Sequence, residues 1–140
     1  MSRDGRDGLA PLVLLVEDEV GLSKLMVMIL EDEGYRVIEA ANGAQGLRKL
    51  EQETPALIIT DYMMPELNGV EMIRAIRRNP AFDHVRILMM SAALPQRIPG
   101  RDLIDQFLPK GTGLDVLIET VRRLVGDEAE PEDSGSDVDV

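Results

Sequence analysis

The sequence predicts an α/β protein in which a parallel sheet lies between two layers of helices. Short apolar runs of strand length alternate with longer segments of helical period, and short links join them. A helix after each strand is the connection that parallel strands need. In addition, two of the apolar runs end in acidic residues, at the sheet edge where open α/β sheets bind their ligands. These observations predict both the fold class and the place of a site.

The predicted strands are mostly continuous apolar runs rather than alternating ones, which is typical of strands buried on both faces. They cover residues 12–16, 36–40, 56–60, 86–90 and 106–109. The first runs directly into Glu17, and the third is followed at once by Asp61.

Four segments have apolar residues at helical spacing, and they cover residues 21–33, 43–53, 69–78 and 114–125. Gly34 follows the first of these helices and suits a left-handed cap. Pro55 prevents the second from continuing, and Pro80 ends the third. The last segment has the most regular helical period in the chain.

The connection from Ala92 to Asp105 departs from this alternation. Pro95, Pro99 and Gly100 interrupt the helix expected there, so only residues 101–105 can form about one turn. We therefore expect a shortened or unwound fourth helix, and we expect this connection to be the most mobile part of the folded body.

Composition excludes several classes of protein. The net charge of -11 argues against sequence-independent nucleic-acid binding, which requires a basic surface. Without cysteine there are no disulfides and no thiolate metal sites. No apolar stretch approaches the length of a membrane span, and the first residues lack the apolar segment of a signal peptide. We expect a cytoplasmic protein that binds neither nucleic acid nor membrane.

The length suits one domain, which we place at residues 11–125. Residues 1–10 are predicted to be a flexible leader. Residues 126–140 are acidic and poor in apolar side chains, so they are predicted to be a disordered tail.

Glu17, Asp18 and Asp61 are expected to meet at neighbouring strand ends. Carboxylates at such short distances repel one another unless a cation lies between them. A hard divalent ion with oxygen ligands relieves this repulsion, and Mg²⁺ suits a site that also meets phosphate oxygens. Alternatively, the first acids only begin a helix, where they favour its dipole. The presence of Asp61 on another strand end favours the metal site.

Lys110 and Ser91 follow two further strands. Lys110 offers a compact ammonium that can pair with one oxygen in a narrow pocket, although a lone lysine is more often exposed. Ser91 can donate its hydroxyl to a phosphoryl oxygen, although a serine there could also be a simple helix cap. Neither His84 nor the segment Gly111-Thr112-Gly113 is given a role, because neither lies in a catalytic or nucleotide-binding pattern.

Together these residues resemble the receiver domain of response regulators in two-component signalling, over roughly residues 11–125. The matching segments are Leu15-Val16-Glu17-Asp18-Glu19, Ile59-Thr60-Asp61-Tyr62-Met63-Met64-Pro65 with Asn68-Gly69, Met90-Ser91-Ala92, Phe107 and Lys110. The resemblance implies a flavodoxin-like three-layer sandwich with strand order 2-1-3-4-5.

The resemblance also implies roles for the acidic residues. Asp61 would be the phospho-acceptor. Mg²⁺ would be bound by Glu17, Asp18, Asp61 and the backbone carbonyl of Met63. Such a protein is not an enzyme in the usual sense, since it catalyses at most its own phosphorylation and dephosphorylation.

Lys110 and Ser91 would then hold the phosphoryl oxygens, and Ser91 and Phe107 would form the switch. The sequence departs from the family in two places. Gly111 replaces the proline that usually follows the lysine in a cis peptide, so this peptide is either cis or trans with a different loop. The connection between Ser91 and Lys110 is also shorter than usual.

We therefore expect a phosphorylatable response regulator that receives its phosphoryl group from a sensor histidine kinase or a histidine phosphotransfer protein. It would signal by contact with a downstream protein, as a monomer or a weak phosphorylation-dependent dimer. One alternative is an adaptor that keeps the fold but acts without phosphorylation. Another is a Mg²⁺-dependent aspartyl phosphohydrolase, which would usually carry a second acid where this chain has Met63.

Overall fold

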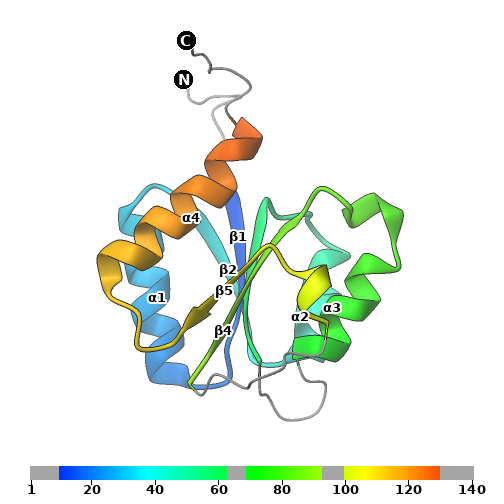
Figure 1. Ribbon diagram of the computed structural model, residues 1–140, viewed down its shortest axis with the longest axis horizontal. Coiled ribbons are helices and arrows are strands. Elements are labelled where there is room, and N and C mark those ends of the chain that lie inside the picture. The colour runs from blue at the N-terminus through cyan, green and yellow to red at the C-terminus, as the bar shows by residue number, and fades with distance from the viewer. Residues whose placement is uncertain (1–9, 63–68, 93–99, 130–140) are drawn as a thin grey trace.

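The computed structural model describes residues 10–62, 69–92 and 100–129, the last three by their backbone alone. In these residues five parallel strands form one sheet in the order β2-β1-β3-β4-β5 (Figure 1). They are β1 (Leu12–Val16), β2 (Arg36–Ala40), β3 (Leu57–Asp61), β4 (Arg86–Ser91) and β5 (Gln106–Pro109). The predicted flavodoxin-like order is confirmed, and every strand lies within one residue of its predicted range.

Helices cover both faces of the sheet, as predicted. The described residues form α1 (Val20–Asp32), α2 (Gly43–Leu50), α3 (Gly69–Arg77) and α4 (Leu114–Ala129), with the 3₁₀ turns η1 (Pro80–Phe82) and η2 (Arg101–Leu103). Figure 1 shows α1 and α4 on one face and α2 and α3 on the other. The chain therefore forms three layers with two separate cores.

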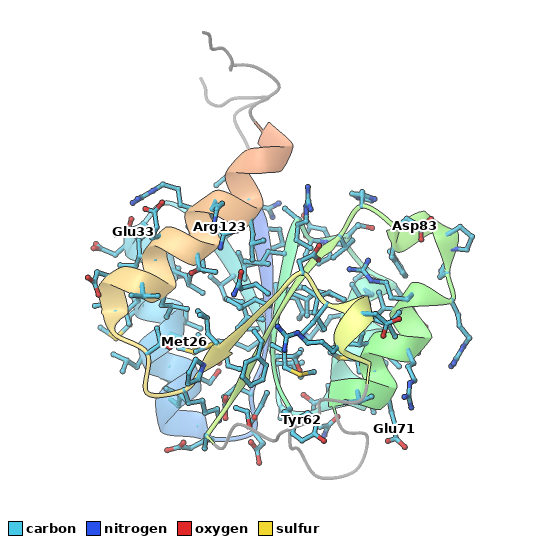
Figure 2. All side chains as sticks on the ribbon, in the orientation of Figure 1. Met26, Glu33, Tyr62, Glu71, Asp83 and Arg123 are labelled. Atoms are coloured by element: carbon cyan, nitrogen blue, oxygen red, sulfur yellow. The ribbon has the colours of Figure 1, made fainter. Side chains whose placement is uncertain are left out.

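The two cores are filled by alternate residues of the same strands. Val13 and Leu15 of β1 belong to the core under α1 and α4, whereas Leu14 and Val16 belong to the core under α2 and α3. All four are buried. Met26 of α1 packs in the first of these cores, on the inner side of its helix (Figure 2). This burial on both faces explains why β1 reads as a continuous apolar run.

The helix ends follow local chemistry. Gly34 has a φ of 98°, which confirms the left-handed cap predicted after α1. The Asn42 side chain caps α2 by accepting the Gln45 N–H at 2.9 Å. This helix ends at Leu50, before the predicted residue 53, and the chain continues as hydrogen-bonded turns to Glu53. No glycine marks that end, so the apolar pattern alone did not locate it.

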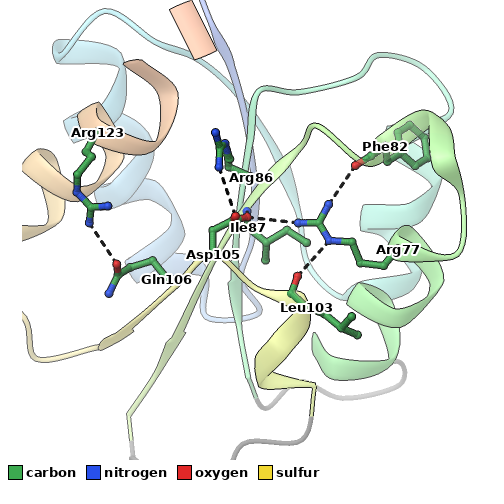
Figure 3. Close-up of polar contacts among 8 residues, drawn as sticks. All are labelled: Arg77, Phe82, Arg86, Ile87, Leu103, Asp105, Gln106 and Arg123. Atoms are coloured by element: carbon green, nitrogen blue, oxygen red, sulfur yellow. Dashed lines mark hydrogen bonds and ion pairs between the residues drawn. The ribbon is translucent and has the colours of Figure 1, made fainter. Parts of the chain in front are cut away.

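The described part of the β4–β5 connection is held by polar contacts (Figure 3). Gly100 has a φ of 77° and is followed by η2, a 3₁₀ turn that lies within the stretch 101–105 where about one turn of helix was predicted. The Arg77 Nε–H donates to the Leu103 carbonyl at 3.1 Å, and Arg77 also pairs with Asp105 at 3.3 Å. Residues 93–99 lie outside the described residues, so the predicted shortening of a helix there and the expected mobility of this connection stay predictions.

Two further elements differ from expectation. The turn η1 was not predicted; it begins at Pro80, where the Asn79 side chain accepts the Ala81 N–H. Helix α4 continues to Ala129, past the predicted domain end at residue 125. No described helix is long and apolar enough to cross a membrane.

Candidate functional site

The parallel sheet brings the predicted site residues to one edge. Glu17 directly follows β1, Asp61 ends β3, Ser91 ends β4, and Lys110 follows β5. Because all of these strands run in the same direction, their carboxyl ends lie together. Tyr62, the residue after Asp61, marks this edge at the bottom of Figure 2.

Lys110 joins two of the acids. Its Nζ lies 2.8 Å from Oδ2 of Asp61 and 3.1 Å from Oε1 of Glu17. Its backbone N–H donates to the Ser91 carbonyl at 2.8 Å, which fixes the loop after β5 to the end of β4. The lysine predicted to be a site residue is therefore in direct contact with the acid predicted to be the phospho-acceptor.

Three carboxylates converge at the same place. One oxygen from each of Glu17, Asp18 and Asp61 lies within 4.8 Å of the others. Glu17 and Asp61 are buried, whereas Asp18 is exposed. An acidic set of oxygen donors, open to solvent on one side, matches the preference of Mg²⁺ for carboxylates and retained waters.

Burial and charge act against each other in this cluster. Burial raises the pKa of Glu17, although the Glu19 N–H and the Lys110 ammonium partly oppose it. Burial alone would lower the pKa of Lys110, but its bonds to Asp61 and Glu17 outweigh that effect and raise it. The lysine is therefore held in its charged form, while ionised Glu17 is disfavoured without a further cation.

Ser91 and Phe107, the two predicted switch residues, are both buried. In the pairing of β4 with β5, Ser91 lies opposite Pro109, and Phe107 lies opposite Met89. Phe107 belongs to the core under α2 and α3. Met63, whose carbonyl was predicted to bind the metal, lies outside the described residues.

The loop after Lys110 resolves one departure from the family. No peptide in the described residues is cis, so Lys110 and Gly111 are joined by a trans peptide. The Thr112 N–H donates to the Pro109 carbonyl at 3.1 Å and closes a turn. The ammonium still reaches Asp61, so this loop places the lysine without a cis peptide.

Sequence reasoning assigned no role to two residues that support Asp61. A Cβ added at Gly69 would collide with the Asp61 carbonyl oxygen, so only glycine fits at the start of α3. The buried Thr60 hydroxyl donates to the same oxygen at 3.1 Å. A glycine at a predicted helix start can indicate a close backbone contact. The sequence did not show that this contact is made by the Asp61 carbonyl.

The family comparison agrees with this geometry. The family model described as the response regulator receiver domain matches residues 13–122. The chain is 34% identical over 131 residues to a transcriptional regulatory protein, a CpxR homolog of Haemophilus influenzae. This match covers 91% of the chain but only 56% of that relative, so the chain spans about half of its length.

Solved structures show the same fold. The receiver domain of a signal transduction histidine kinase from Syntrophus aciditrophicus aligns with a TM-score of 0.77 and 27% identity, covering 94% of this chain and 98% of that one. The receiver domain of a sensor histidine kinase from Pseudomonas aeruginosa aligns with a TM-score of 0.75 and 27% identity. The alignment covers 84% of this chain and 98% of that one. That structure holds a magnesium ion in its active-site cleft.

Receiver domains belong to two-component systems, bind Mg²⁺ at an acidic site, and are generally phospho-acceptors rather than enzymes of the usual kind. The acidic cluster at the strand ends, the fold and the family match all agree. This chain belongs to the response regulator receiver domain family.

Proposed function

We propose that the chain accepts a phosphoryl group on Asp61 from a sensor histidine kinase or a histidine phosphotransfer protein. The observation that supports this most is the position of Asp61, buried at a strand end with the Lys110 ammonium 2.8 Å away. Because Asp61 ends β3, the sheet backbone holds its carboxylate in place, and a fixed nucleophile favours attack along one line.

Glu17, Asp18 and Asp61 would hold Mg²⁺, with the Met63 carbonyl as a further ligand. The ion, when bound, supplies positive charge that offsets the charge of the phosphoryl oxygens during transfer. Two of these acids already share Lys110, and the third faces solvent, from which the donor must approach. The donor set fits the ion through its oxygen chemistry.

Lys110 and Ser91 would hold oxygens of the phosphorylated side chain. In this proposal Ser91 moves toward the new group because a charge-assisted hydrogen bond is stronger than a neutral one. Phe107 then fills the space that Ser91 leaves, and the surface beside β4 and β5 changes. A downstream protein reads that surface, with the chain acting as a monomer or as a weak phosphorylation-dependent dimer.

The test is phosphorylation by acetyl phosphate with Mg²⁺, followed by electrophoresis that retards phosphoproteins. The wild type should be retarded, and Asp61→Asn should not, because the amide is not a nucleophile for this transfer. Asp83→Asn removes an exposed acid after η1, far from Tyr62 in Figure 2, and should behave as the wild type.

Two results would contradict the proposal. No retardation of the wild type, under conditions where it binds Mg²⁺, would favour the adaptor that acts without phosphorylation. Sustained release of inorganic phosphate from other phosphate esters would favour the phosphohydrolase.

A further inference from the structure

A cavity of about 340 Å³ lies beside the site, between α1, α4 and the sheet. Its walls are mostly apolar. The side chains from the two helices are Leu22, Leu25, Met26, Ile29, Leu114 and Leu117. This volume falls within the range of about 300–1,000 Å³ that is usual for pockets that bind small molecules.

Two apolar side chains of this cavity are exposed to solvent. Leu25 is 53% exposed and Leu114 is 50% exposed, whereas Met26 and Leu117 deeper in the cavity are buried. A hydrocarbon chain in the cavity would remove Leu25 and Leu114 from water. That burial is favourable in proportion to the apolar area covered.

The other end of the cavity is polar and carries a net negative charge. Glu17, Asp61 and Lys110 line it, together with Thr112. Among the described residues that line this end, two carboxylates face one ammonium, a formal charge of about -1 when both acids are ionised, before the nearby Asp18 is counted. A cationic head group is therefore attracted here, and an anionic head group is repelled.

A second hollow, of about 260 Å³, opens on the other side of Glu17 and differs in kind. Most of its lining residues are polar or charged, among them Asp18, Ser23, Glu39 and Gln45. Water and hydrated ions suit that hollow, and a hydrocarbon chain does not. Glu17 thus separates a polar approach to the site from an apolar one.

We propose that the apolar cavity binds a small aliphatic amine. Its hydrocarbon chain lies between α1 and α4, and its ammonium lies at Glu17 and Asp61. The same carboxylates are the proposed Mg²⁺ ligands, so the amine and the metal compete. Binding itself does not depend on the proposed function, but the consequence that the amine slows phosphorylation does rest on it.

Octylamine is the probe, titrated below its micelle concentration into the methyl-labelled full chain and followed by NMR. Saturable shifts are expected for the methyl groups of Leu25, Met26 and Leu114. Octanoate, which has the same chain length and the opposite charge, should produce at least about tenfold weaker binding. Added Mg²⁺ should raise the apparent Kd of octylamine.

Matched variants separate the cavity from general surface binding. Leu25→Ser should weaken octylamine binding about tenfold, the effect of losing the burial of one apolar side chain. Met28→Ser should not, because Met28 is 68% exposed on the same helix and does not line the cavity. Leu114→Ser provides a second test from the opposite wall.

Three outcomes would overturn the proposal: no saturable shifts, equal binding of octanoate, or equal loss in the Leu25 and Met28 variants. Phosphorylation by acetyl phosphate is measured separately on the same samples without amine. Normal phosphorylation with no amine binding would refute only the cavity proposal. Amine binding without phosphorylation would refute only the proposed function.

Discussion

Two charged clusters lie at the two ends of β5, and they are balanced in opposite ways. Before the strand, Asp105 pairs with Arg77 at 3.3 Å and Arg86 at 3.5 Å, and it accepts the Ile87 N–H at 2.8 Å (Figure 3). After the strand, Lys110 pairs with two acids, Glu17 and Asp61. The first cluster has more donors than carboxylates, and the second has more carboxylates than cations.

This difference separates a structural contact from a site. The Asp105 cluster is satisfied by the chain itself and joins α3, β4 and the start of β5. In the part of the chain that the structure describes, the Lys110 cluster has more carboxylates than cations at a partly buried position, where a cation from outside the chain can bind. The following predictions test this difference, from the largest expected effect to the smallest.

Asp105→Ala should lower the free energy of unfolding by about 1–3 kcal/mol, because it leaves the N–H of buried Ile87 without its carboxylate acceptor. Urea denaturation followed by circular dichroism measures this. Asp102→Ala, which removes an exposed acid of η2, is the control and should change stability by less than about 0.5 kcal/mol. Equal losses in the two variants would show that the Asp105 contacts do not stabilise the fold.

Gly69→Ala should also destabilise, by about 1–3 kcal/mol, because the new Cβ would displace the Asp61 carbonyl. Gly21→Ala is a matched control at the start of α1, where nothing lies within 4 Å of the added Cβ. That control should instead stabilise by up to about 1 kcal/mol. A neutral Gly69→Ala variant, with normal phosphorylation, would mean that close packing against Asp61 is not required.

Glu17→Gln should have the smallest effect on stability, and with the opposite sign. Burial raises the pKa of Glu17 in the folded protein above its value in the unfolded chain. The stability that protonated Glu17 contributes is therefore fully present below the pKa of the unfolded chain, and it is lost as the pH rises through the pKa of the folded protein. At neutral pH the metal-free variant should therefore unfold at slightly higher denaturant than the wild type, and the gain should fade in acid.

The same variant should bind Mg²⁺ about tenfold more weakly or worse, because it loses one charged ligand. Denaturation in a chelator and titration with Mg²⁺ measure the two effects on one sample. A variant that is less stable at neutral pH would show that the Lys110–Glu17 pair outweighs the cost of the buried charge.

The strand ends could be predicted because their signals are local. Continuous apolar runs predicted β1 and β3, and parallel direction then placed Glu17, Asp61 and Lys110 at one edge. The resemblance to receiver domains provided the residue roles. Placing these residues at one edge of the sheet did not require any distance between their side chains.

The features that were missed depend on contacts between distant segments. Arg77 and Asp105 are 28 residues apart, and nothing in either local pattern indicates that they pair. The collision at Gly69 is likewise a matter of tertiary geometry, and the choice between cis and trans at Gly111, which the sequence left open, was settled only by the structure. The end of α2 was misplaced because Glu51, Gln52 and Glu53 are compatible with a helix, and no glycine stops it before Pro55.

The central claim is that Asp61 receives the phosphoryl group. Treatment with acetyl phosphate and Mg²⁺, borohydride reduction of the acyl phosphate, and tandem mass spectrometry locate the modified residue directly. Modification is expected at Asp61, and none is expected when Mg²⁺ is chelated. Modification at Glu17, Asp18 or His84 in place of Asp61 would contradict it.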